Sequence, residues 1–333
     1  MGTGGRERIS VILLNMGGPD TLSAIRPFLF NLFRDSDIIK IPGGAIPQIL
    51  FAYLLSGYRA RKVKPFYEMI GGGSPLNRIS MVQAGMLERQ LNDAGRELFT
   101  VHLGMRYWYP FTRDAVGEIC EINPTRIIAL PLYPQYSRAT TGSSFNDLER
   151  HLSKAVPDVG LTKVDHYFDH PGYIDSIREI LEGTLSDKRE GNTLLIFSAH
   201  GLPKSMIEEG DPYQSQVEAT VGAVMDALPD YSHIVSYQSR AGKRWLEPGT
   251  DEVIRGARGE GYDTVVLVPV SFVSDHMETL YEMDILYREM AEDSGLAFKR
   301  SPSLNDSPTF IRALGKITLA ALRPRKENSW PGK

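Results

Sequence analysis

A histidine at the end of an apolar segment is the first side chain in this sequence that could do acid–base or metal chemistry. His200 follows the run Thr193–Ser198 and precedes Gly201-Leu202-Pro203, so we expect it at the carboxyl end of a strand. An imidazole there can accept a proton near neutral pH, or bind a metal ion through a neutral ring nitrogen. A purely structural hydrogen-bonding role is the alternative, and the residue alone does not decide between them.

A stripe of carboxylates follows a second apolar run. Asp275, Glu278 and Glu282 are spaced i, i+3, i+7 after Thr264–Phe272, which predicts that they share one side of a helix. Because like charges at this spacing repel each other, they need a cation, a shared proton or solvent. Carboxylate oxygens with an occasional imidazole suit a weakly held divalent ion. The alternative is a solvated acidic helix N-terminus, where carboxylates are favoured without any ligand.

Aromatic and arginine side chains gather after the remaining apolar runs. They occur in Arg106–Tyr109 and Tyr133–Ser144, and again as Ser239, Arg240 and Trp245. Together, such groups could hold a large planar ligand by stacking, with arginines binding carboxylates at its edge. Packing in the core is the alternative for any one of these aromatic side chains.

Eight short apolar runs, separated by longer helical patterns, must position these side chains. Continuous apolar runs that alternate with amphipathic helices indicate parallel strands covered by helices on both faces. In such sheets the ligand lies outside the carboxyl ends of the strands, which is where the polar clusters fall. The predicted strands are Ile9–Asn15, Leu98–Leu103, Arg126–Leu132, Leu161–Phe168, Thr193–Ser198, His233–Gln238, Thr264–Phe272 and Leu296–Ser301.

The runs form two sets of four, which predicts an internal duplication. Corresponding second, third and fourth strands lie about 135–138 residues apart, and the first strands about 184. A first copy with roughly fifty extra residues after its first strand explains this difference; chance similarity between α/β units is the alternative. We therefore predict an N-terminal domain over residues 1–168, a C-terminal domain over 169–333, and a cleft between them. A last helix, at about 306–322, could pack back on the first domain.

The extra residues include an apolar segment at about residues 38–66, called the lip below. Ala45–Leu55 is apolar, but it is too short to span a bilayer and is interrupted by Pro47. Basic residues follow directly at Arg59, Arg61, Lys62 and Lys64. One interpretation is an apolar edge with a cationic border, which could touch a membrane surface or a flat apolar ligand with carboxylates. The other is a buried helix followed by a solvated basic turn.

Composition limits the class of protein. The 333 residues include 37 Lys and Arg against 41 Asp and Glu, a net charge of −4, so the chain lacks the basic surface of a protein that coats nucleic acid. Its single cysteine, Cys120, excludes an internal disulfide and a Cys-ligated iron–sulfur cluster. Met1–Ser10 contains no signal-peptide stretch, and no run of about 18 apolar residues occurs. We therefore expect a cytoplasmic protein.

The motifs at the strand ends resemble those of a known family, the ferrochelatases, from Val11 to about Phe310. They fall at the same strand ends that the chemistry of the side chains singles out. The motifs are LLNMGGPDTL (13–22), IGGGSPL (70–76), GMRYWYP (104–110), YPQYS-x-x-TTGSS (133–144), SAHGLP (198–203), GDPY (210–213), WLEPGTDE (245–252) and SDHMETLYEMDILY (274–287).

The resemblance implies an α/β chelatase fold, in which two similar Rossmann-like domains, each a four-stranded parallel sheet flanked by helices, enclose a porphyrin cleft. It also implies an enzyme, a lyase of heme biosynthesis that inserts Fe²⁺ into porphyrin. The family's invariant histidine, expected to accept pyrrole protons, falls on His200, and its metal-site glutamate falls on Glu278. Asp275 and Glu282 match neighbouring acidic residues that would help to hold or deliver the metal.

Other positions match residues around the porphyrin. Met16 matches the residue on the opposite face of the macrocycle, where relatives acting on coproporphyrin carry tyrosine and protoporphyrin enzymes typically carry methionine. Together with the apolar lip, this predicts protoporphyrin IX as substrate and protoheme, or heme b, as product. The further substrate-binding residues that the resemblance implies are Arg59, Tyr67, Ser74, Arg106, Tyr107, Trp245 and His276.

The chain departs from the animal relatives in several places. Those proteins ligate an iron–sulfur cluster through C-terminal cysteines and one cysteine in the YPQYS segment; here that position is Arg138, and no cysteine lies beyond Cys120. We therefore expect no cluster and no tightly bound cofactor, with Fe²⁺ as a substrate. The tail Arg323–Lys333 lacks the extension associated with dimers, which predicts a monomer. No mitochondrial presequence is recognised, and the lip at 45–55 predicts peripheral contact with the inner face of the cell membrane.

Two alternatives remain open. A chelatase for another tetrapyrrole, such as coproporphyrin III or the substrates of the cobalt and sirohydrochlorin relatives, would use a similar site, although those smaller enzymes lack the lip. A noncatalytic porphyrin or heme carrier on the same fold would bind porphyrin but would not need His200 together with Glu278.

Overall fold

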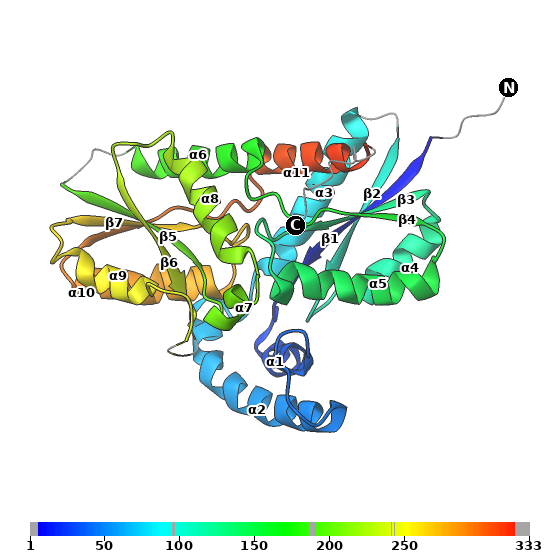
Figure 1. Ribbon diagram of the computed structural model, residues 1–333, viewed down its shortest axis with the longest axis horizontal. Coiled ribbons are helices and arrows are strands. Elements are labelled where there is room, and N and C mark those ends of the chain that lie inside the picture. Colours follow the sequence, from blue (N-terminus) through cyan, green and yellow to red (C-terminus); the bar gives the residue numbers. More distant parts are fainter. Residues whose placement is uncertain (1–5, 95–96, 187–190, 241, 243, 324–333) are drawn as a thin grey trace.

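Two parallel β-sheets with the same strand order form the framework of the protein (Figure 1). The computed structural model describes residues 6–94, 97–186, 191–240, 242 and 244–323. The orders are β2-β1-β3-β4 and β6-β5-β7-β8, and all neighbouring strands are parallel. The strands are β1 (Arg8–Asn15), β2 (Leu98–Met105), β3 (Arg126–Pro131), β4 (Gly160–Lys163), β5 (Thr193–His200), β6 (Ser232–Gln238), β7 (Thr264–Pro269) and β8 (Ala297–Arg300).

The predicted α/β fold with two four-stranded parallel sheets is therefore confirmed. The central strands are mostly apolar because helices cover both faces of each sheet; β1 and β5 are buried over almost their whole length. The outer strand β4 is shorter than the predicted Leu161–Phe168. After Lys163 the chain leaves the sheet, and its last apolar residues, such as Tyr167, pack in the core beneath it.

Helices fill the connections between the strands. The regular helices are α1 (Ile25–Arg34), α2 (Ala45–Met69), α3 (Leu76–Ala94), α4 (Thr112–Ile122), α5 (Ser143–Ala155), α6 (Pro171–Leu185), α7 (Lys204–Glu208), α8 (Tyr213–Met225), α9 (Thr250–Ala257), α10 (Arg288–Asp293) and α11 (Pro308–Ala321). A short 3₁₀ helix, η1 (Leu22–Ala24), precedes α1. Two π-helices, η2 (Arg138–Gly142) and η3 (Glu278–Tyr287), follow β3 and β7, the corresponding strands of the two sheets.

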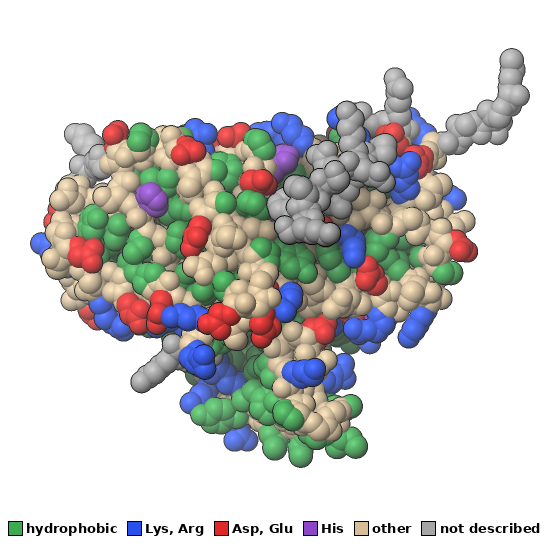
Figure 2. All heavy atoms as spheres, viewed as in Figure 1, with side chains coloured by type: hydrophobic (Ala, Val, Ile, Leu, Met, Phe, Trp, Pro, Cys, Tyr) green, Lys and Arg blue, Asp and Glu red, His purple; other side chains and the backbone are tan. Residues whose placement is uncertain are grey.

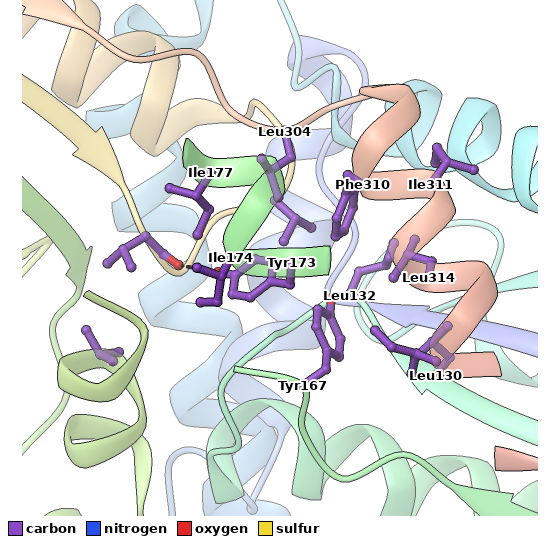
Figure 3. Close-up of a cluster of buried hydrophobic side chains, with 14 of the residues drawn as sticks. Leu130, Leu132, Tyr167, Tyr173, Ile174, Ile177, Leu304, Phe310, Ile311 and Leu314 are labelled. Carbon is purple, nitrogen blue, oxygen red and sulfur yellow. Dashed lines mark hydrogen bonds between the residues drawn. The ribbon is translucent and has the colours of Figure 1, made fainter. Parts of the chain in front are cut away.

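Helices α6 and α11 join the two sheets through one continuous core. Tyr173 of α6 and Phe310 of α11 are fully buried, and their neighbours include side chains at the end of β3 (Figure 3). The Tyr173 hydroxyl donates to the carbonyl of Val270, just after β7. Helix α11 also contacts α3 of the first half. The two halves are thus held together by packing, and the domain boundary at 168/169, which lies between β4 and α6, stays a prediction.

The lip forms the long helix α2, which projects with α1 below the sheets in Figure 1. Pro47 does not interrupt it, because proline is tolerated in the first turn of a helix. The helix continues through the basic residues, so the alternative of a buried helix followed by a basic turn is wrong. Several of its apolar residues are instead exposed, Ile46 by 81% and Leu54 by 62%, while Ala52, Val63 and Tyr67 are buried. In the described part of the chain, no helix is long and apolar enough to cross a membrane.

Candidate active site

A histidine–glutamate pair lies where two strands of the second sheet end. His200 is the last residue of β5, and Glu278 is the first residue of η3, which follows β7. The Nδ1 atom of His200 lies 2.9 Å from Oε2 of Glu278. The histidine side chain remains 38% exposed and that of Glu278 only 15%. The imidazole is therefore oriented by a nearly buried carboxylate, while part of its ring remains accessible to a substrate.

The main chain of His200 is also held in place. Its N–H donates to Ser271 Oγ at 3.1 Å, and its carbonyl accepts from the hydroxyl of Tyr213 at 3.1 Å. Tyr213 begins α8 and lies in the GDPY motif. These contacts fix the end of β5, so the ring position does not depend on the Glu278 contact alone.

Opposing effects set the protonation of the pair. Burial lowers the pKa of His200, but the charge and hydrogen bond of Glu278, with the charge of Glu282, more than offset it, so the pKa lies above its ordinary value. Burial likewise raises the pKa of Glu278, and the neighbouring His200 outweighs this and holds that pKa well below its usual range. The geometry therefore favours an ionised carboxylate that stabilises a protonated imidazole.

A second carboxylate, Glu282, lies one turn further along η3. Its Oε2 accepts from Ser239 Oγ at 2.7 Å and from Gln238 Nε2 at 3.2 Å. Burial, followed by the negative charge of Glu278, raises the pKa of Glu282 to about 7. Glu282 also lines a cavity of about 530 Å³ with Arg240 and other residues of the second half. The carboxylate can therefore exchange protons near neutral pH and communicates with solvent.

Asp275 occupies a different environment. Its carboxylate accepts from Arg300 at 3.1 Å, from Ser303 at 2.8 Å and from Asn305 at 2.8 Å. Burial raises the pKa of Asp275, but Arg300 and the hydrogen bonds outweigh it and leave the pKa lowered. Asp275 also lines a second cavity, of about 560 Å³, beside the glycine-rich loop. Of the predicted metal ligands, His200 and Glu278 are in contact, and Glu282 is near enough for its charge to act on His200. The charge of Asp275 is instead balanced by Arg300.

Three predicted substrate-binding residues surround this cluster. His276 is buried against Phe272, with ring centroids 4.8 Å apart, and Tyr67 of α2 is buried in a small cluster that includes Met277. Burial, together with the charge of Glu278, raises the pKa of Tyr67. Trp245 pairs with Pro203, and its ring lies against Gly201, directly after His200. These three side chains therefore lie near the histidine–glutamate pair.

Arg106 and Tyr107 lie instead in a polar cluster of the first half, centred on Asp35. Asp35 Oδ2 accepts from Arg106 Nη2 at 2.7 Å, from the Tyr107 hydroxyl at 2.7 Å and from Ser143 Oγ at 2.8 Å. A second carboxylate, Asp147, lies 3.6 Å from Arg106 Nη1. The Arg106 side chain is only 13% exposed, so its charge is balanced by carboxylates of its own chain.

The remaining predicted residues lie around the end of β1 and on the lip. Met16 follows β1 as His200 ends β5: the N–H of Leu132 donates to Leu14 O, and that of Val270 donates to Ser198 O. The acceptor Leu14 lies two residues before Met16, and the acceptor Ser198 lies two residues before His200, so Met16 and His200 occupy equivalent positions. Ser74 is buried against Gly18, where a Cβ would lie 2.7 Å from Ser74 Oγ. Arg59 is exposed on α2.

Sequence reasoning missed Asp35, Gln238 and Ser271, all of which hold site residues by hydrogen bonds. Gln238 is the last residue of a predicted strand, so its place at a carboxyl strand end was a usable signal. Asp35 directly follows α1 in a segment without any motif, and it meets Arg106 only through the tertiary fold. Among the described residues, no three His, Cys, Asp or Glu side chains converge to hold a metal ion by themselves.

Comparisons with known proteins add an independent line of evidence. A family model described as Ferrochelatase matches residues 8–322. A protein named Ferrochelatase from Geobacter metallireducens is 47% identical over 318 residues, covering 95% of this chain and 99% of that protein. A protein named Ferrochelatase from Geotalea daltonii is 46% identical over 314 residues, covering 93% of this chain and 97% of that protein.

Solved structures agree with this fold. The structure of SirB from Bacillus subtilis with Fe³⁺ has a TM-score of 0.59 at 10% sequence identity, covering 94% of this chain and 95% of that one. At such low identity the similarity shows the fold alone, which is the chelatase fold.

Proposed function

The chain belongs to the ferrochelatase family and is a lyase of heme biosynthesis that inserts iron into a porphyrin; on this premise we propose its substrate and the roles of its residues. The porphyrin is protoporphyrin IX, His200 accepts the pyrrole protons, and Glu278 holds or delivers Fe²⁺. The observation that carries this assignment is the 2.9 Å contact between His200 Nδ1 and Glu278 Oε2, made by a ring that is still partly exposed.

Proton removal is the step for which His200 is suited. Two pyrrole protons must leave the macrocycle as iron enters, and a general base must lie within hydrogen-bond reach of them. His200 accepts a proton, and the ionised carboxylate of Glu278 stabilises the resulting imidazolium. Because Glu282 has a pKa near 7 and borders the cavity of about 530 Å³, it can accept the proton next and release it to solvent.

Iron is a substrate here and needs only transient ligands. Carboxylates bind Fe²⁺ as oxygen ligands, and imidazole adds a nitrogen. Glu278 and Glu282 would hold the ion next to His200, and the pyrrole nitrogens would take it over. Two carboxylates leave coordination positions of Fe²⁺ open, and the pyrrole nitrogens can occupy these as the macrocycle loses its protons. One cysteine in the chain leaves no ligand set for an iron–sulfur cluster.

The exposed apolar residues of the lip favour an apolar substrate that reaches the protein from a membrane. Exposed apolar residues along α2 form a patch at the base of the molecule in Figure 2, and Lys and Arg side chains flank it. An apolar face bordered by cations suits the surface of an anionic lipid bilayer. It also suits protoporphyrin, which combines an apolar macrocycle with two carboxylates. We propose peripheral membrane contact by this face. That the protein is a monomer stays a prediction, because the tail residues 324–333 on which it is based lie outside the described residues.

The test is a turnover measurement under anaerobic conditions. The protein is mixed with Fe²⁺ and either protoporphyrin IX or coproporphyrin III, and the loss of porphyrin fluorescence is followed. Multiple turnovers with protoporphyrin at the higher kcat/KM are expected. A preference for coproporphyrin would overturn the proposed substrate while leaving iron insertion intact. Stoichiometric binding of porphyrin without turnover would contradict the proposed roles of His200 and Glu278.

A further inference from the structure

A glutamine from the first half holds the segment that leads into η3. Gln83 of α3 is fully buried, although it lies in a helix whose neighbouring residue Val82 is exposed. Its Nε2 donates to Ser274 Oγ at 3.0 Å and to the carbonyl of Asn305 at 2.7 Å. The three residues, called the Gln83 bridge below, join segments 191 and 222 residues apart in sequence. A buried amide in such a contact has a specific task, because leaving its partners without hydrogen bonds is costly.

The second half makes the reciprocal contact. Gln216 of α8 accepts through Oε1 from the N–H of Tyr136 at 2.7 Å. Helices α3 and α8 occupy corresponding places, each leading into the second strand of its own sheet. Tyr136 and Ser274 also correspond, since each lies between the third strand of a sheet and the π-helix that follows it. Each half therefore reaches across with a glutamine and holds the loop before the π-helix of the other half.

The Gln83 bridge acts on the residues that carry Glu278. Ser274 begins the turn, and its carbonyl contacts Nδ1 of His276 at 3.1 Å. The next residue, Asp275, bonds Asn305 twice: its N–H donates to Asn305 Oδ1 at 2.8 Å, and its carboxylate accepts from Asn305 Nδ2 at 2.8 Å. Gln83 thus contacts the first residue of the turn that leads to Glu278, and also Asn305, which bonds the second residue of that turn.

Asn305 has a backbone conformation that its contacts help to hold. Its φ of 43° lies in the left-handed region, which asparagine tolerates better than most other residues with a side chain. Its N–H donates to the carbonyl of Val273, and it also contacts Gln83 and Asp275. Replacing Gln83 removes one of these contacts, beside the turn that leads into η3.

We infer that Gln83 is a positioning residue for iron insertion: by tying α3 to Ser274 and Asn305, it sets the Glu278 carboxylate relative to His200 and couples that geometry to the packing of the two halves. The inference rests on the proposed role of Glu278 at the metal. Gln83 itself touches neither the substrate nor the reacting atoms. Residues hydrogen-bonded directly to a metal ligand commonly change metal affinity or activity by about 10–100-fold when they are replaced. Gln83 contacts the turn before Glu278 rather than Glu278 itself, so we expect an effect at the lower end of that range.

The test compares the two glutamines. Gln83→Met and Gln216→Met each replace a buried amide by an apolar side chain of similar length. For each variant, the KM for Fe²⁺, kcat, the Kd for protoporphyrin and the melting temperature are measured. We expect Gln83→Met to raise the KM for Fe²⁺ about tenfold, with the Kd for porphyrin unchanged within about twofold. Gln216→Met should lower the melting temperature by a similar amount but leave the KM for Fe²⁺ unchanged. The loop that Gln216 contacts, at Tyr136, carries no proposed metal ligand.

An equal change in the KM for Fe²⁺ in both variants, or none in Gln83→Met, would overturn the inference, because a purely structural bridge predicts those results. If Gln83→Met does not fold, Ser274→Ala removes one contact of the bridge and keeps the other, and should raise the same KM by a few fold. A Ser274→Ala variant with an unchanged KM would then overturn it. Glu278→Gln serves as the reference. If Glu278→Gln keeps the normal KM for Fe²⁺, the proposed role of Glu278 fails. If Glu278→Gln changes that KM and Gln83→Met does not, only the inference about Gln83 fails.

Discussion

The two halves place polar clusters at corresponding ends of their two sheets, but balance charge differently. In the first half one guanidinium, Arg106, meets two carboxylates, at 2.7 Å from Asp35 and 3.6 Å from Asp147. In the second half one imidazole, His200, meets two carboxylates, Glu278 by hydrogen bond and Glu282 through its charge. Each cluster thus contains two carboxylates, and the clusters differ in the cation, which is arginine in the first half and histidine in the second.

That difference separates a structural cluster from a chemical one. Arginine stays charged at any pH a protein experiences, so this cation does not exchange its proton. Histidine can lose its charge, so the second cluster can pass protons. Its carboxylates shift in opposite directions, with the pKa of Glu278 lowered and that of Glu282 raised to about 7. Opposite shifts in neighbouring acids are what a site needs to contain both a base and a proton donor at one pH.

Removing the titratable cation should have the largest effect. We expect His200→Ala to lower kcat about 10²–10⁴-fold, because a positioned general base contributes that much. The Kd for protoporphyrin, measured by fluorescence quenching, should change only a few fold. The matched control is His151→Ala in the first half, where a ring exposed to a similar extent, 35%, lies 3.7 Å from Asp147. His151→Ala should keep full turnover; an unchanged kcat in His200→Ala would remove it as the base.

Removing the permanent cation should affect stability instead. Arg106→Met leaves Asp35 buried without its ion pair, and we expect the free energy of unfolding to fall by about 3–5 kcal/mol, measured by urea denaturation. Arg255→Met serves as control, because its pair with Asp251 is exposed on both sides, 58% and 38%, and should contribute less than about 1 kcal/mol. Normal stability with a large loss of porphyrin affinity would instead place Arg106 at the substrate, as the family resemblance implies.

Neutralising one carboxylate of the second cluster should move the pH dependence. Glu278 raises the pKa of His200, and proton acceptance requires the neutral ring, so activity rises with pH through that raised pKa. In Glu278→Gln the pKa of His200 falls, and the acidic limb of the kcat profile should shift to lower pH. The KM for Fe²⁺ should rise about 10–100-fold.

Glu282→Gln provides the comparison for that shift. Glu282 raises the pKa of His200 by less than Glu278 does. Replacing Glu282 should therefore shift the acidic limb of the kcat profile to lower pH as well, but by a smaller amount. A limb that stays in place in Glu278→Gln would mean that a group other than His200 limits the reaction.

Local chemistry in the sequence predicted the sheets and the strand ends, but not which side chains meet. His200 and Glu278 were both found because each follows a strand, and parallel strands bring their carboxyl ends to one edge. Asp275 was assigned to the same stripe on the assumption of one continuous helix. The helix begins only at Glu278, so Asp275 lies in the preceding turn and pairs with Arg300. Arg106 met Asp35, 71 residues away, a contact that no local pattern signals.

The smallest expected effect comes from the position at which the two halves correspond most directly. Met16 follows β1 where His200 ends β5, so the two halves present a neutral thioether and an imidazole at equivalent strand ends. If Met16 selects the porphyrin, Met16→Tyr should lower the ratio of kcat/KM for protoporphyrin IX to that for coproporphyrin III by several fold, because a phenol offers a hydrogen bond that methionine does not.

A tyrosine placed on the exposed surface separates selectivity from a general effect. Met69→Tyr is suitable, since Met69 is 56% exposed at the end of α2, and it should leave that ratio unchanged. A ratio that does not move in Met16→Tyr would assign porphyrin choice to the lip rather than to the end of β1. In that case the first half would contribute packing and membrane contact, and both selection of the metal and removal of protons would belong to the cluster in which histidine replaces arginine.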